Sequence, residues 1–148
     1  MQDVVSIEKV MQAKGHHFPG GKYRIEHWEN FLLTACTGAD LMAEGVVHPV
    51  ALFHVPILGA GTTIAEMFTL GYAESDMSVS IESYDWHLFE PIREDVFYTI
   101  SGNISDVDRV TVEHRVYDRV VFHFNLKLPD GQEAARSTIV WHFNRRAS

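Results

Sequence analysis

The segment Ile57–Gly71, near the middle of the chain, carries a single charged residue, Glu66, and constrains the fold more than any other stretch. Its apolar residues are spaced as in a helix, and a helix with so little polar surface must be covered by protein on nearly all sides. We therefore expect a buried central helix. We place its first turn at Pro56, because a start at Pro49 would leave Pro56 inside the helix at about 3 kcal/mol.

Two glycines fall inside this predicted helix. Gly59 and Gly61 each cost about 1 kcal/mol relative to alanine in a helix interior. Their presence indicates that another backbone, a ligand or a tightly packed sheet approaches the helix closely at this point.

The second half of the chain is strand-like, with apolar residues on alternate positions and turn residues between the runs. Pro129-Asp130-Gly131 indicates a hairpin turn before the last strand. Preceding the central helix we expect a helix over residues 3–14, capped by Asp3, and a short strand over 22–25. The predicted later strands cover residues 78–90, 95–104, 110–116, 120–128 and 137–143. This order predicts an antiparallel sheet wrapped on one central helix.

A further helix is predicted from Glu26 to about Thr37. Its apolar residues Trp28, Phe31, Leu32 and Ala35 recur at intervals of three and four, which predicts one buried face. Gly38 suits the position just past a helix end. Asp40 then lies on the loop that follows.

Composition excludes several classes of protein. The chain has 148 residues, of which 46% are apolar, which is enough for one domain spanning 1–148 with residues 1–20 as an N-terminal helix and loop. Cys36 is the only cysteine, so we expect no metal and a reducing, cytoplasmic setting. The net charge of −8 and the interrupted apolar stretches argue against nucleic acid and membrane partners. The start of the chain shows no secretory signal. Of the basic residues, Arg136, Arg145 and Arg146 are candidates for binding ligand phosphates.

Four stretches together are similar to the hotdog fold. They are FPGGKYRIEHWENFLLTACTGAD, VPILGAGTTIAEMF, ESYDWHLFEPIREDVFYTISGNI and LPDGQEAARSTIVWHF, and the similarity covers roughly residues 18–144. Within that fold the chain resembles the MaoC-like enoyl-CoA hydratases and 3-hydroxyacyl thioester dehydratases. The resemblance implies an α+β fold, a lyase acting on acyl-CoA or acyl-carrier-protein thioesters without a cofactor, and a homodimer or a heteromer with another hotdog subunit.

The family's signature after the first helix is DxNPxH, whose Asp and His act on water and on the substrate. Asp40 stands at the position of that Asp, but Gly45 replaces the His. The nearest histidines are His48 and His54, so the resemblance makes Asp40, His48 and His54 the candidate catalytic residues. Each also has an ordinary alternative: Asp40 as a turn residue, His48 as a loop residue and His54 as a core histidine.

The thioester oxygen needs a backbone N–H donor near the start of the central helix. Because the prolines have no N–H, we expect the donor to come from a neighbour such as Ile57 or Leu58. We therefore take Ile57, Leu58, Gly59 and Gly61 as candidate substrate-binding residues.

Three functions remain open. The first is a hydratase or dehydratase, either with an unusual Asp40–His48 pair or as the substrate-accommodating subunit of a pair. The second is an acyl-CoA thioesterase that uses Glu66. The third is a non-catalytic subunit that binds an acyl thioester or only a partner protein.

Overall fold

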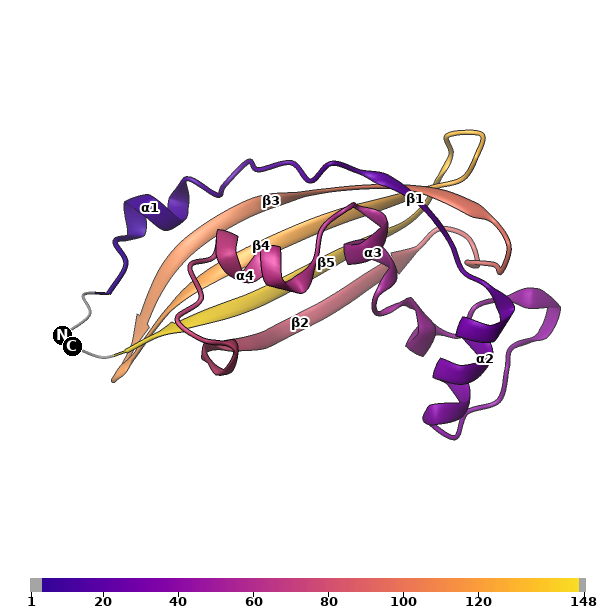
Figure 1. Ribbon diagram of the computed structural model, residues 1–148, viewed down its shortest axis with the longest axis horizontal. Helices are drawn as coiled ribbons and strands as arrows, with labels where there is room; N and C mark the ends of the chain where they lie inside the picture. Colours follow the sequence, from indigo (N-terminus) through magenta and orange to yellow (C-terminus); the bar gives the residue numbers. More distant parts are fainter. Residues whose placement is uncertain (1–3, 147–148) are drawn as a thin grey trace.

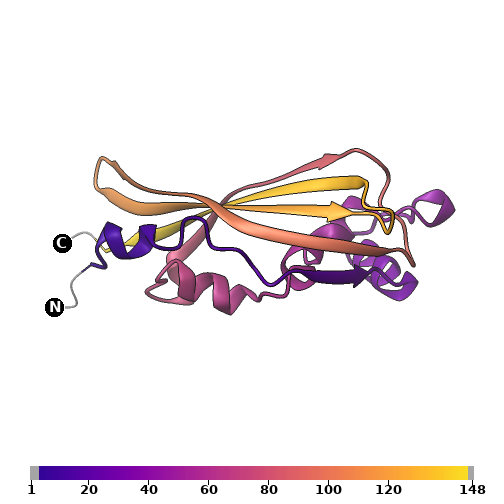
Figure 2. The same ribbon diagram turned by 90° about the horizontal axis from the view of Figure 1, so that it is seen from above.

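One curved antiparallel sheet forms the body of the molecule, and α2, α3 and α4 lie on one side of it (Figures 1 and 2). The structure, a computed structural model, describes residues 4–146. Its elements in chain order are α1 (Ile7–Met11), β1 (Gly21–Arg24), α2 (His27–Cys36), the 3₁₀ turns η1 (Ala43–Gly45) and η2 (Pro49–Leu52), α3 (Val55–Gly59), α4 (Ile64–Leu70), the 3₁₀ turn η3 (Asp76–Ser78), β2 (Val79–Leu88), β3 (Phe97–Val112), β4 (Arg115–Lys127) and β5 (Glu133–Arg145).

The five strands are ordered β1-β3-β4-β5-β2, so β1 and β2 are the two edges. The hairpin at Pro129-Asp130-Gly131 is confirmed, because the Leu128 N–H donates to the Gln132 carbonyl across it. The separate strand predicted over 110–116 is wrong. A tight turn at Glu113 and His114 divides these residues between the ends of β3 and β4. Glu113 adopts a left-handed φ of 54°, a conformation that is uncommon for glutamate and that the sequence therefore does not predict.

The N-terminal helix is shorter than predicted. It covers Ile7–Met11, and Ser6 occupies its N-cap position. The predicted cap, Asp3, lies outside the described residues. Gly15 follows with a φ of 82°, and its N–H donates to the carbonyl of Ile104 in β3.

The core lies between the concave face of the sheet and α3 and α4. Alternate residues of β4 and β5 point to this face, and Phe122, Phe124, Ile139 and Phe143 are fully buried. The prediction of a sheet wrapped around a central helical segment is thereby confirmed.

The central helix itself is broken, which differs from the single helix predicted over 57–70. Residues 55–59 and 64–70 form two short helices, and Gly61 turns the chain between them with a φ of 75°. Thr63 then caps α4, because its Oγ1 accepts the Glu66 N–H at 3.1 Å. Both prolines open helical turns: Pro49 begins η2, and Pro56 lies in the first turn of α3.

This segment is also less covered than predicted. Leu58 is 52% exposed and Ile64 47% exposed, and Glu66 is exposed. Gly59, in contrast, is buried against β3, where an added methyl group would overlap the side chain of Ile100. Close packing against the sheet therefore explains this glycine.

Helix α2 is oriented opposite to the prediction. Its buried residues are the polar Asn30 and Thr34, whereas Trp28, Phe31 and Leu32 are 49–59% exposed. The helix ends as predicted, with Thr37 as the C-cap and Gly38 at a φ of 73°.

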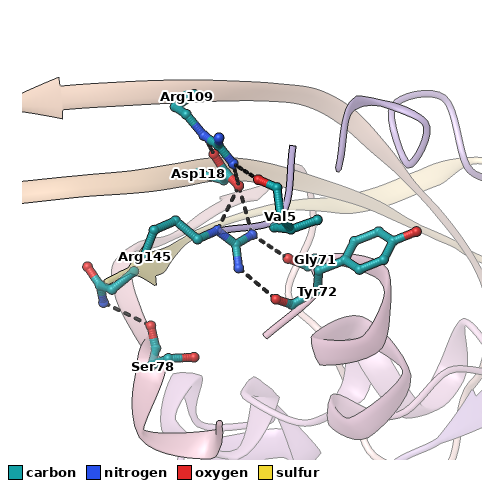
Figure 3. Close-up of polar contacts among 8 residues, drawn as sticks. Val5, Gly71, Tyr72, Ser78, Arg109, Asp118 and Arg145 are labelled. Atoms are coloured by element: carbon teal, nitrogen blue, oxygen red, sulfur yellow. Dashed lines mark hydrogen bonds and ion pairs between the residues drawn. The ribbon is translucent and has the colours of Figure 1, made fainter. Parts of the chain in front are cut away.

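A cluster of buried charged side chains joins strands β3, β4 and β5 to the residues that follow α4 (Figure 3). Asp118 of β4 accepts hydrogen bonds from Arg109 of β3 and from Arg145 of β5. Arg145 also donates to the carbonyls of Gly71 and Tyr72 after α4, at 2.7 and 2.6 Å. Arg145 is therefore a structural residue that satisfies the end of α4, and its predicted role in phosphate binding is not supported.

Candidate active site

A mostly apolar pocket of about 540 Å³ lies between α2, η2 and the edge strand β2. It is lined by Leu33, Pro49, Val50, Phe53, His54, Tyr84 and Trp86. A pocket of this kind, with few polar groups among hydrophobic walls, is typical of small-molecule sites. His54 carries the only imidazole among its lining residues.

The pocket wall is held rigidly where β2 faces η2. Tyr84 and Phe53 stack with ring centroids 4.9 Å apart, and the Tyr84 hydroxyl donates to the Phe53 carbonyl at 3.1 Å. Burial raises the pKa of Tyr84 well above its ordinary value, so the phenol stays neutral. Tyr84 is therefore a fixed, uncharged wall.

His54 occupies the N-cap position of α3 and contacts two polar side chains behind the pocket. Its Nε2 lies 3.0 Å from Oε2 of Glu29 in α2 and 3.1 Å from the hydroxyl of Tyr23 in β1. The Tyr23 hydroxyl donates to the same Glu29 oxygen at 2.7 Å. The neighbouring elements β1 and α2 and the more distant start of α3 thus bring together a phenol, a carboxylate and an imidazole.

The charge states of this cluster follow from its contacts. Burial acts to raise the pKa of Glu29, but hydrogen bonds from Tyr23 and His54 outweigh it, and the pKa lies below its ordinary value. Burial, and then the neighbouring Glu29, raise the pKa of Tyr23 far above the usual range. Near neutral pH the carboxylate is therefore ionised and the phenol keeps its proton.

The buried polar face of α2 anchors the pocket to the rest of the fold. Asn30 donates to Glu94 at 2.7 Å, and its side-chain oxygen accepts the His48 N–H at 3.1 Å. His27 also lies 3.1 Å from Glu94. These bonds hold α2 to the chain that leads into η2, which forms one wall of the pocket.

The three predicted catalytic residues are placed differently. His54 lines the pocket. His48 caps η2, because its Nδ1 accepts the Val50 N–H at 3.2 Å. Asp40 is exposed, and no hydrogen bond or ion pair within residues 4–146 joins it to either histidine. The structure therefore shows no contact that pairs Asp40 with His48.

The four predicted substrate-binding residues lie outside the lining of this pocket. Ile57 and Gly59 are buried, Leu58 is half exposed, and Gly61 forms the turn between α3 and α4. The N–H of Leu58 donates to the His54 carbonyl at 3.2 Å, so it does not offer the free donor expected of it.

Sequence reasoning missed Glu29 and Tyr23. Glu29 falls in the first turn of α2, where an acidic residue is ordinary, and its Oε1 accepts the Glu26 N–H as part of a capping box. Tyr23 lies in a strand of four residues. No spacing in the sequence connects either residue to His54, and only the fold brings them together.

The other two candidate arginines are exposed and lie near carboxylates. Arg136 pairs with Glu133, and Arg146 lies 3.5 Å from Glu74. Among the described residues, no group of three or more His, Cys, Asp and Glu side chains is arranged to hold a metal ion. In the same range no single helix has the length and hydrophobicity to cross a bilayer, although Pro49–Gly59 and Ile64–Leu70, bent by 62°, meet that criterion when taken together.

Comparisons with known proteins find similarity in structure only. No family model and no curated protein matches the sequence. The HadBC complex, a 3R-hydroxyacyl-ACP dehydratase from Mycobacterium tuberculosis, contains a chain that is 13% identical with a TM-score of 0.65, over 88% of this chain and 96% of that one. A MaoC-like dehydratase from Phytophthora capsici is 7% identical with a TM-score of 0.62, over 97% of this chain and 51% of that one.

A third solved structure comes from outside the dehydratases. A hypothetical thioesterase from Streptococcus pneumoniae is 11% identical with a TM-score of 0.53, over 95% of this chain and 87% of that one. At these identities the likeness concerns the fold, and activity must be argued from the site. The five-stranded antiparallel sheet, the helices on its concave face and these structural neighbours show that the chain has the hotdog fold, which MaoC-like dehydratases share.

Proposed function

We propose that this chain catalyses the reversible hydration of an enoyl thioester, with the acyl group bound in the pocket between α2, η2 and β2. The observation that carries the proposal is His54, an imidazole backed by a carboxylate at the wall of an otherwise apolar pocket. Dehydratases among the structural neighbours support the reaction class.

The chemistry requires one proton to leave water and one to reach the α-carbon. His54 accepts a proton from water as the oxygen forms a bond to the β-carbon and the electron pair of the double bond moves to the α-carbon. His54 then returns that proton to the α-carbon, so that one water is added in total and His54 is regenerated. General acid–base action of this kind contributes about 10²–10⁴-fold in rate. The apolar walls supply the binding surface for the acyl chain.

A two-signal assay tests the proposal. The protein is incubated with short and bulky enoyl-CoA esters, while loss of the conjugated enoyl absorbance and release of free thiol are followed in parallel. Loss of absorbance without thiol, abolished by His54→Gln, is the expected result. Thiol release would instead indicate a thioesterase, and absence of both signals would indicate a binding subunit.

The thioesterase alternative with Glu66 as its carboxylate has less support in the site. Glu66 is exposed on α4, accepts a hydrogen bond from Thr62 at 2.8 Å and lies outside the lining of the pocket. The thioesterase neighbour nonetheless shares the fold, which is why the assay follows thiol release as well.

We also propose that a second hotdog chain, identical or different, covers the exposed side of α2 and the edge strand β2. Trp28, Phe31 and Leu32 form an apolar surface on α2, and β2 offers unpaired backbone groups along one side. The HadBC neighbour is itself a complex. Light scattering gives the mass of the particle in solution, measured once for the chain purified alone and once for the chain purified together with the proteins that accompany it. A monomer under both conditions would exclude the association.

A further inference from the structure

We propose that Glu29 and Tyr23 are positioning residues that leave the Nδ1 atom of His54 as the proton acceptor of the pocket. The inference rests on the proposed function for the reaction that this atom serves. It assigns the carboxylate partner of the catalytic histidine to α2 instead of the loop that contains Asp40.

The hydrogen-bond geometry restricts where the imidazole proton can lie. The Tyr23 hydroxyl has one proton and donates it to Glu29 Oε2 over the short distance of 2.7 Å. His54 Nε2 therefore faces two acceptors, the carboxylate oxygen at 3.0 Å and the phenol oxygen at 3.1 Å. A bare Nε2 lone pair would be repelled by both, so Nε2 must carry the proton.

An ionised Glu29 strengthens this restriction. A carboxylate can only accept hydrogen bonds, and hydrogen bonds to a charged acceptor are roughly twice as strong as those between neutral groups. The phenol of Tyr23 stays protonated beside it, since burial and the carboxylate both raise its pKa. The imidazole is thereby held with a proton on Nε2.

The other ring nitrogen is left available. Nδ1 of His54 has no hydrogen bond to any residue between 4 and 146. It is also not one of the buried, unpartnered side-chain atoms, so it is not sealed inside the protein. Its lone pair is consequently accessible on a residue that lines the pocket. Under the proposed function, this nitrogen is the base that His54 offers to the substrate.

The fold holds Glu29 in place independently of His54. Glu29 Oε1 accepts the Glu26 N–H at the start of α2, and a glutamine at this position satisfies the same capping box. Glu29→Gln therefore keeps the helix start while its amide can donate to Nε2 and favour the opposite tautomer. Glu8→Gln, an exposed change on α1 at the other end of the sheet, is the matched control (Figure 1).

The experiment combines nitrogen NMR of the His54 ring, assigned with His54→Gln, and steady-state kinetics of enoyl-CoA hydration. For the wild type and Glu8→Gln we expect the ring proton on Nε2. In Glu29→Gln we expect loss of that tautomer and a fall of kcat by about 10²-fold or more with KM little changed. Tyr23→Phe keeps the carboxylate and is expected to show a smaller fall in kcat.

The outcomes separate the two proposals. If the wild type hydrates enoyl thioesters but Glu29→Gln keeps both the tautomer and kcat, the positioning role is overturned and the proposed function stands. If the wild type hydrates no enoyl thioester, the proposed function fails, and only the NMR spectra of the His54 ring then test the positioning role. A changed tautomer in Glu29→Gln supports that role, and an unchanged tautomer overturns it.

Discussion

Asp118 and Arg145 form an ion pair whose two side chains are both fully buried, with Oδ2 of Asp118 2.7 Å from Nη2 of Arg145. Arg109 binds the same carboxylate from the other side. One acid therefore stabilises two guanidinium groups inside the fold. Such an arrangement makes a sharp prediction, because removal of one partner leaves buried charge without compensation.

Asp118→Asn is expected to destabilise the protein by about 3–5 kcal/mol, since both arginines lose their counter-charge. Urea unfolding followed by circular dichroism measures the change. The control is Glu82→Gln, which breaks the exposed pair with Arg119 and is expected to cost less than about 1 kcal/mol. Equal effects of the two substitutions would show that the buried pair is not special.

Gly59→Ala is expected to destabilise the fold by about 1–3 kcal/mol, because the added methyl group overlaps Ile100. Ile100→Val removes the overlapping carbon and makes room. In a double-mutant cycle by urea unfolding, the combined variant should therefore lose less stability than the sum of the two single changes. If the losses of unfolding free energy in the two single variants simply add in the double variant, the destabilisation by Gly59→Ala does not come from the contact with Ile100.

Because α2 buries its polar face and exposes its apolar face, alanine should cost more stability at a polar residue of this helix than at an apolar one. Asn30→Ala should destabilise the monomer by about 1–3 kcal/mol, since it leaves the His48 N–H without its partner and removes one of the hydrogen bonds to Glu94. Phe31→Ala, at a side chain that is 49% exposed, should change monomer stability far less. Thermal unfolding at low protein concentration compares them, and a larger loss for Phe31→Ala would contradict the orientation of the helix.

Stability should depend on pH through Glu29. Its pKa in the folded protein lies below the ordinary value, so it contributes stability that is present above the unfolded pKa and lost as pH falls through the folded one. The difference in unfolding free energy between wild type and Glu29→Gln should therefore be constant near neutral pH and shrink in acid. Urea titrations between about pH 3 and pH 7 test this, and a difference that grows toward low pH would refute it.

Much of the architecture could be predicted from local patterns. Alternating apolar residues indicated the sheet, Pro129-Asp130-Gly131 located a hairpin, and Gly38 marked the end of a helix, because each depends on backbone preferences of a few neighbouring residues. The break at Gly61 depends on equally local features, a left-handed glycine followed by the Thr63 cap. The break was not predicted, because the apolar residues on both sides of Gly61 continue with helical spacing.

The sequence by itself determined that an antiparallel sheet packs against an apolar central segment, since periodicity shows which residues share a face. Periodicity does not show what a face will meet. Only the tertiary structure decided that α2 buries Asn30 and exposes Phe31, because polar partners such as Glu94 come from a distant loop. For the same reason only the fold brings Glu29 and Tyr23 to His54: hydrogen bonds across 25 and 31 positions depend on how strands and helices are placed in space.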